Sequence, residues 1–256
     1  MMKKLLIVLL VLIVAIGGGA WYLLSGADEF IRAQIEKQGS QYLGTTVSVS
    51  GVSLAIREGR MEISELEVDN PQGFSDEDAF SLDDIVLDLG GSVSEPYRVQ
   101  EVTINAPEVL YEVDESGQGN LVVLKNNLQK NLPKGGEQQS SNEQAPLMIV
   151  ENVTVSNVKL LVNFEKLNTG EFKIDKKAYE VTLPTFNAGP IGEPNGMPAN
   201  EVGAAIVNAM LDNIIAKAKD EAKNVLKDKA REKLEKEKDK LLDKAGDKLK
   251  GLLDNG

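Results

Sequence analysis

The hydrophobic positions of this chain first form one unbroken run, Leu5 to Leu24, which contains no charged residue. At about 1.5 Å per helical residue the run spans about 30 Å, the thickness of a bilayer's hydrocarbon core, so it predicts a transmembrane anchor. Lys3 and Lys4 precede the run, and Trp21 and Tyr22 lie near its far end, where an aromatic belt would meet the membrane interface. The positive-inside rule then places the rest of the chain outside the cytoplasm.

A cleaved signal peptide is the alternative interpretation of the same run. Ser25-Gly26-Ala27 supplies the small residues of a cleavage site. The apolar run is longer than the roughly 7–15 residues usual in a signal peptide, which favours a retained anchor. Either interpretation places the bulk of the protein outside the cytoplasm.

Beyond the anchor, the hydrophobic pattern changes its period. Helical spacing over Asp28–Tyr42 predicts a short helix that Gly44 ends. Alternating spacing then predicts about ten short strands between residues 45 and 183, joined mostly as a meander, with one face of the sheet buried and the other in water. Leu121–Leu132 returns to helical spacing, and the polar stretch 133–146 predicts a mobile loop.

The segment from Ala199 to Leu253 has the spacing of one long helix. Its first turns carry an apolar stripe that predicts packing on the preceding domain, but beyond Lys217 the stripe thins and charged residues fill the other faces. Three interpretations of this charged part stay open: a solvated single helix, a helix on a membrane surface, and a helix that binds a partner or itself. The absence of aromatic residues after Phe186 weighs against the membrane surface.

These patterns predict a mainly β protein with helical termini. They divide the chain into a cytoplasmic stub with the anchor (1–27), a β-rich domain (28–198) and the long charged helix (199–256).

Composition narrows the function. The chain has no His and no Cys, which removes the usual zinc ligands, disulfides and the His-activated nucleophiles of hydrolases, so we expect neither an enzyme nor a cofactor or metal site. The net charge is −12, and residues 217–256 carry thirteen Lys and Arg against ten Asp and Glu, so the acidity lies in the rest of the chain. An acidic body excludes nucleic acid as the expected partner.

Short motifs follow one another in a set order through the first 190 residues. They are Ile35-Glu36, Leu43-Gly44, the alternating Val47, Val49, Val52, Leu54, Gly59, Ile63, Leu66 and Val68, then Asn70-Pro71-Gln72-Gly73-Phe74, Val102-Thr103-Ile104-Asn105-Ala106-Pro107, Tyr111-Glu112, Gly119-Asn120-Leu121 and Ile149-Val150-Glu151-Asn152-Val153. In this order they resemble the amino-terminal region of the AsmA-like proteins of Gram-negative bacteria. The resemblance implies an inner-membrane anchor, a periplasmic domain with a curved, groove-like antiparallel sheet, and a role in phospholipid transport or outer-membrane biogenesis. The family has no catalytic motif.

Two functions follow as hypotheses. In the first, an open apolar groove binds acyl chains of membrane lipids, with candidate lining residues Val47, Val49, Leu54, Ile56, Ile63, Ile85, Leu87 and Leu89. The same aliphatic side chains would otherwise form a closed core against the predicted helix Leu121–Leu132. In the second hypothesis the protein is a non-catalytic envelope scaffold, whose charged C-terminal helix binds an envelope protein or a membrane surface.

Overall fold

The computed structural model describes residues 26–55, 58–90, 94–132, 145–166 and 178–253. The predicted anchor, from Leu5 to Leu24 with Trp21 and Tyr22, lies outside the described residues. So do the groove candidate Ile56 and almost all of the loop predicted at 133–146. No helix in the described part of the chain is long and apolar enough to cross a membrane.

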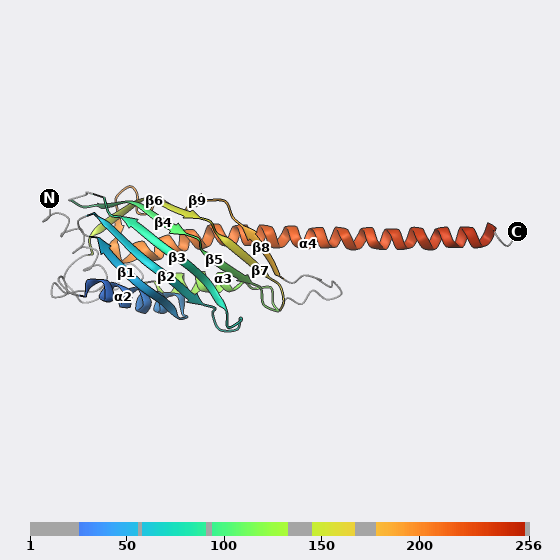
Figure 1. Ribbon diagram of the computed structural model, residues 1–256, viewed down its shortest axis with the longest axis horizontal. Coiled ribbons are helices and arrows are strands. Elements are labelled where there is room, and N and C mark those ends of the chain that lie inside the picture. Colours follow the sequence, from blue (N-terminus) through green and yellow to red (C-terminus); the bar gives the residue numbers. More distant parts are fainter. Residues whose placement is uncertain (1–25, 56–57, 91–93, 133–144, 167–177, 254–256) are drawn as a thin grey trace.

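Along the described chain, two runs of five strands are separated by one helix and flanked by two others (Figure 1). These elements are α2 (Ala27–Leu43), β1 (Val47–Ala55), β2 (Arg60–Asp69), β3 (Asp78–Asp88), β4 (Tyr97–Asn105), β5 (Glu108–Glu112), α3 (Asn120–Asn131), β6 (Leu147–Ser156), β7 (Lys159–Asn163), β8 (Ala178–Thr182), β9 (Phe186–Asn187), β10 (Met197–Pro198) and α4 (Ala199–Leu253).

The fold is mixed α/β, and the prediction of a mainly β protein with an antiparallel, groove-like sheet is wrong. The ten strands among the described residues form one large open sheet in which β1, β2, β3 and β4 are antiparallel neighbours, but β4 pairs with β6 and β5 pairs with β7 in parallel. Parallel neighbours cannot be joined by a tight turn. The helix α3 lies in the connection from β5 to β6, so the chain does not continue as a meander.

The parallel part of the sheet is an internal repeat. β4 and β5 follow one another along the same line in the sheet, with a short break between them, and β6 and β7 do the same on the neighbouring line. Each paired residue of β4 or β5 lies opposite the residue 51 positions later in the sequence. Both lines break at the same level, where Ala106 and Asn157 have left-handed φ values of 46° and 57°. The sequences VTINAPEVLYE (102–112) and VTVSNVKLLVN (153–163) therefore occupy equivalent positions.

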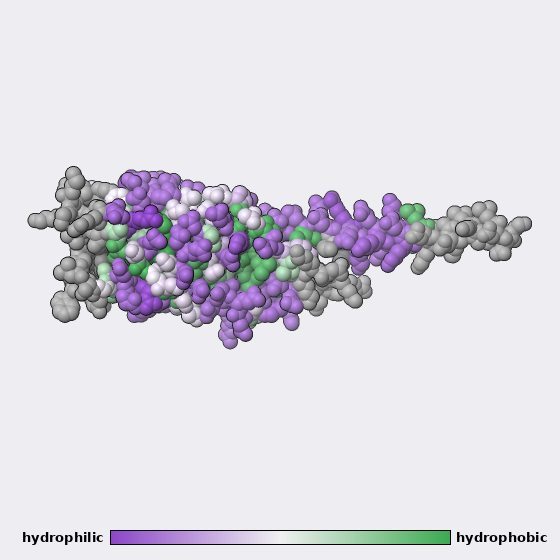
Figure 2. Space-filling model, in the orientation of Figure 1, coloured by the Kyte–Doolittle hydropathy of each residue, from purple (hydrophilic) through white to green (hydrophobic). Residues whose placement is uncertain are grey.

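The three helices of the described residues use one face of this sheet. Figure 1 shows the strands in front, with α3 and α4 behind them and α2 at the β1 end of the sheet. α2 packs on β1, α3 on β5, and α4 on β6, β7 and β10, while α3 also contacts both other helices. The face turned to the viewer in Figure 2 is mostly hydrophilic with smaller hydrophobic patches. The main hydrophobic core thus lies between the sheet and the helices.

Polar side chains of α2 hold it against the exposed edge of β1. Glu36 accepts a hydrogen bond from the Val49 backbone N–H at 3.1 Å, and Arg32 donates one to the Val49 carbonyl at 3.2 Å while it pairs with Glu36. Ser40 accepts a bond from the Val47 N–H at 2.9 Å. These bonds satisfy strand groups that would otherwise have no partner in the sheet.

The helix α4 packs on the domain over its first seven turns and then leaves it. Ile214 and Ala218 have no exposed surface, and Ala222 and Val225 pack against the core. Farther on, Leu234 and Leu242 are 67% and 59% exposed, and Figure 1 shows the helix running far beyond the sheet. The domain therefore uses more of this helix than the thinning stripe at Lys217 suggests.

We predict that a chain ending after Asp228 melts within about 2 °C of the full chain, because no side chain described beyond Val225 packs against the hydrophobic core. A chain ending after Ala216 loses Ala218, Ala222 and Val225, whose burial is worth about 2 kcal/mol, or about 4–8 °C in Tm. Circular dichroism melting of both chains measures this. Equal Tm values for the two truncations would contradict the packing of α4 described above.

Candidate functional site

A cavity of about 320 Å³ lies between the helices and the middle of the sheet. Its walls come from α2, α3, the first turns of α4, and strands β1, β2, β3, β4 and β6. The lining consists of Ile31, Gln34, Ile35, Gln38, Gly39, Tyr42, Leu43, Val47, Met61, Ile63, Leu66, Val68, Phe80, Leu82, Ile85, Leu87, Val99, Val102, Ile104, Leu121, Leu124, Leu128, Met148, Val150, Ala199, Asn200, Val202, Gly203, Ala204, Ile206, Val207, Met210 and Leu211.

The cavity exists because two of the covering helices lie far apart. α2 packs on β1 and α4 packs on β6, and three strands separate β1 from β6. At about 4.8 Å per strand this distance is about 19 Å, whereas packed helices lie about 8–10 Å apart. The small helix α3 bridges α2 and α4 at one side. No helix of the described chain fills the rest of the gap over β2, β3 and β4.

Two hydrophobic clusters meet at the gap. One lies under α3 and α4, and the smaller one joins Ile31 of α2 to Val49, Met61 and Ile63 of the sheet. Three side chains, Leu66, Ile85 and Leu87, pack against both clusters and stay half-buried. They form the part of the cavity floor that the helices leave open.

A change of parity in β2 keeps apolar side chains from both halves of the strand on this floor. In β2 both Met61 and Ile63 and the residues of opposite parity, Leu66 and Val68, line the cavity. Between them Glu65 has a left-handed φ of 47° and accepts a hydrogen bond from Ser50 of β1. The left-handed residue reverses the facing of the side chains that follow it in β2. Odd-numbered positions before Glu65 and even-numbered positions after it therefore face the same cavity.

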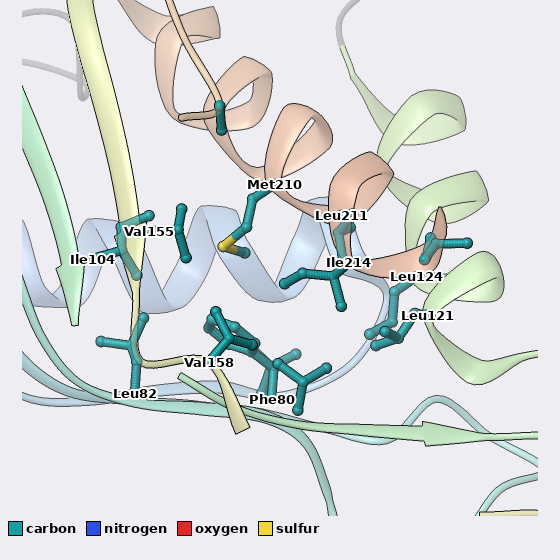
Figure 3. Close-up of a cluster of buried hydrophobic side chains, with 14 of the residues drawn as sticks. Phe80, Leu82, Ile104, Leu121, Leu124, Val155, Val158, Met210, Leu211 and Ile214 are labelled. Carbon is teal, nitrogen blue, oxygen red and sulfur yellow. The ribbon is translucent and has the colours of Figure 1, made fainter. Parts of the chain in front are cut away.

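Beyond the cavity the core is closed. Figure 3 shows Met210, Leu211 and Ile214 of α4 directed toward Phe80 of β3 and Val158, which lies between β6 and β7, with Leu121 and Leu124 of α3 at the side. Val155, Val158 and Ile214 have no exposed surface and do not line the cavity. The cavity therefore ends near Phe80, Leu82 and Met210, which are each about one-twentieth exposed.

The polar groups of the lining are few and uncharged. They are the amides of Gln34, Gln38 and Asn200 and the phenol of Tyr42, on α2 and α4. Burial, and then the negative charge of Glu201, raises the pKa of Tyr42, so its hydroxyl stays protonated near neutral pH. All four residues are half-buried or exposed, which places them at the rim.

The residue Gly203 leaves the rim open on the α4 side. It is exposed, it lines the cavity, and a Cβ added to it would meet no heavy atom within 4 Å. The opposite rim is tighter, because a Cβ on Gly39 of α2 would approach the Val47 side chain to 3.1 Å.

The structure brings only some of the predicted groove residues together. Val47, Ile63, Ile85 and Leu87 line the cavity. Val49 is buried in the small cluster under α2, Leu54 packs at its margin, and Leu89 is buried in the main core. These three do not line the cavity. Ile56 lies outside the described residues.

The cavity residues that the alternating pattern did not suggest come mainly from helices. Ile35 and Gln38 of α2 and Ile206 of α4 belong to helical faces that the sequence shows as amphipathic, but their spacing does not say which strands they cover. Met148 and Val150 of β6 reach the cavity only because β6 pairs with β4. That parallel pairing has no local signal in either strand.

Several residues of the motifs found in the sequence converge on a buried polar cluster beside the cavity. Glu112, 2% exposed, accepts hydrogen bonds from Asn70 and from the Ser75 backbone N–H at 3.3 and 3.0 Å. Asn120, fully buried, donates to Asn70 and to the Leu110 carbonyl, and accepts from the Glu112 N–H. This cluster fixes the start of α3, so these motif residues hold the fold and do not touch the cavity.

The charge of Glu112 is maintained inside this cluster. Burial has the largest single effect and raises its pKa, but the hydrogen bonds from Ser75 and the nearby Lys166, 3.0 Å away, together outweigh burial. The pKa of Glu112 is therefore lower than the ordinary value for Glu.

The described residues contain no group of three or more His, Cys, Asp or Glu side chains placed to hold a metal ion. Comparison of the chain with protein-family models, with curated proteins and with solved structures found no match. The resemblance to AsmA-like proteins therefore stays a prediction.

We predict that Glu112→Gln lowers the free energy of unfolding by about 1–3 kcal/mol at pH 7, because a buried charged hydrogen-bond acceptor is weakened. Since folding lowers the pKa of Glu112, its contribution is present above the unfolded pKa of about 4.3 and is lost as pH falls through the lower folded value. Urea titrations from pH 7 to pH 3 should show less acid destabilisation in the variant than in the parent. Parallel pH profiles for the two proteins would refute this assignment.

The cavity wall and the closed core should respond differently to a buried charge. Ile85→Asp places a carboxylate at the half-buried floor, where water reaches it, so the protein should stay folded with a cooperative melting transition. Val158→Asp places one where no surface is exposed, which costs several kcal/mol and should unfold the domain. Val86→Asp is the control, because Val86 lies between Ile85 and Leu87 in the same strand and the variant carries the same low strand propensity of Asp. A molten Ile85→Asp protein would mean that the floor is closed.

Proposed function

We propose that this protein binds a single alkyl chain, such as a lipid acyl chain, in the cavity between α2, α4 and the sheet. The observation that carries the proposal is an almost wholly aliphatic cavity that reaches the surface at a rim of neutral polar groups. Binding sites for small apolar ligands have this composition, with volumes of roughly 300–1,000 Å³.

The size of the cavity suits one chain. If each methylene takes about the 30 Å³ share of a water molecule, about 320 Å³ holds about ten carbon groups. At about 0.8 kcal/mol per buried methylene, ten groups contribute about 8 kcal/mol, which corresponds to micromolar affinity before the costs of ordering the ligand. A lipid with two long chains would leave one of them outside.

A lipid-handling role in the cell envelope fits this binding site. The predicted anchor Leu5–Leu24 would place the domain at a membrane outside the cytoplasm, and the AsmA-like resemblance favours the bacterial inner membrane and the periplasm. Both remain predictions from the sequence. A pocket of this size supports a local carrier or a lipid-sensing adaptor, because it takes up one chain at a time and forms no long groove among the described residues.

Recruitment of a partner is a second candidate function, favoured by the projecting part of α4. Beyond Val225 the described helix continues for 28 residues, about 42 Å, and exposes Leu234 and Leu242. The two functions can be separated, since a chain ending after Asp228 keeps every cavity residue.

The alkyl-binding proposal is tested by photolabelling the full chain in membranes with an uncharged dodecyl probe that carries a diazirine. We expect labelled residues to map to the cavity. Gly203→Phe should reduce cavity labelling at least about tenfold, because it fills the open rim without a clash at its Cβ. Gly203→Ala is the matched control: it makes the same change to the helix backbone and should label like the parent.

Two results would contradict the proposal. One is labelling confined to residues outside the cavity, and the other is equal cavity labelling of Gly203→Phe and Gly203→Ala in proteins with the same melting temperature.

A further inference from the structure

We infer that the cavity selects a single-chain lipid whose head group is uncharged, such as an ester or an alcohol, and discriminates against fatty-acid anions. This inference rests on the proposed function, because it concerns the head group of the chain that the cavity would bind. It follows from the charges around the rim.

The described lining contains no basic residue that could pair with a carboxylate. Its polar members are the three amides of Gln34, Gln38 and Asn200 and the Tyr42 hydroxyl. Amides and a phenol both donate and accept hydrogen bonds, so they match an ester carbonyl or a hydroxyl group. The nearby Arg32 on α2 is engaged by Glu29 and Glu36 and by the Val49 carbonyl.

The field at the rim also disfavours an anion. α4 begins at Ala199, and the start of a helix carries a partial positive charge that would attract an anion. Glu201 in the first turn offsets this charge, and it is close enough to raise the pKa of Tyr42. The chain before residue 217 is also strongly acidic, so no long-range attraction compensates.

A carboxylate in this position would be partly dehydrated and unpaired. Such a group is costly to bury unless a cation or several donors satisfy it. A neutral ester of the same chain length loses much less hydration. The difference should exceed about tenfold in binding.

The experiment compares two photoreactive probes on the full chain in membranes at pH 8. Both carry the same twelve-carbon acyl chain and diazirine, and they differ only in having a methyl ester or a free carboxylate. Cavity labelling by each probe is divided by its labelling of the whole protein. We expect an ester-to-acid ratio of at least about ten in the parent chain.

A charge added at the rim should change this ratio. Gln38→Lys supplies a cation on a half-buried helical position, and it should lower the ester-to-acid ratio at least about tenfold. Gln38→Met is the matched control, because it removes the same amide and keeps the length of the side chain without adding a charge. Three neutral polar groups and no cation stay in the described lining, so its ester-to-acid ratio should stay well above that of Gln38→Lys. Because the cavity labelling of each probe is divided by its own labelling of the whole protein, and variants are compared by the same ratio, differences in how the two probes partition into the membrane cancel.

The outcomes separate the two proposals. A parent ratio near one, with cavity labelling by both probes that Gly203→Phe abolishes, would overturn the head-group inference and leave alkyl binding intact. No labelling of the cavity by either probe would overturn the proposed function itself. A high parent ratio that Gln38→Lys fails to lower would show that the rim charges do not set the preference, which also overturns the inference.

Discussion

The hydrogen bonds that tie α2 to β1 determine where that helix can lie. Hydrogen bonds join the side chains of Glu36, Arg32 and Ser40 to the backbone of Val47 and Val49. These bonds hold α2 at the edge of the sheet, so it cannot also cover the middle. At the other side of the cavity, α4 packs on β6 and β7, and the ion pair between Lys125 and Asp212 joins α4 to α3. The cavity is the space left between α2 and α4, each of which packs on a different part of the sheet.

The floor of that space depends on local backbone conformation. Left-handed φ at Glu65 turns β2 over, which directs four of its apolar side chains into the gap. Left-handed φ at Ala106 and Asn157 breaks both lines of the parallel ladder at one level. The buried Asn70–Glu112–Asn120 cluster then fixes the start of α3 against this ladder. An apolar cavity is thus framed by polar interactions in its surroundings.

Local elements were predictable from the sequence wherever one residue or one period determines them. The helix before β1 ends at Gly44, whose left-handed φ of 69° is the expected helix stop, and the long helix runs over Ala199–Leu253. The apolar positions of the sequence change parity between Ile63 and Leu66, and the structure places Glu65, with its left-handed φ, at that point.

Long-range arrangement was not predictable in the same way. The spacing of Leu121, Leu124 and Leu128 indicates a helix, but it does not say that this helix carries the chain across to a parallel strand. The meander prediction failed for that reason. The eight groove candidates were chosen by alternation within strands, which finds buried positions such as Val49 and Leu89 as readily as cavity positions such as Ile85. Cavity walls built from α2 and α4 depend on which strands those helices cover, and no single segment contains that information.

The most direct test of this account is to locate the two ends of a bound chain. Two uncharged dodecyl probes, one with a diazirine at the last carbon and one with it beside the head group, can be crosslinked to the full chain and mapped by mass spectrometry. The account predicts that the last carbon labels Phe80, Leu82 and Met210 at the closed end, and that the head-group position labels Gln38 and Gly203 at the rim. Labelling of the same residues by both probes, or of the projecting helix around Leu234, would contradict it.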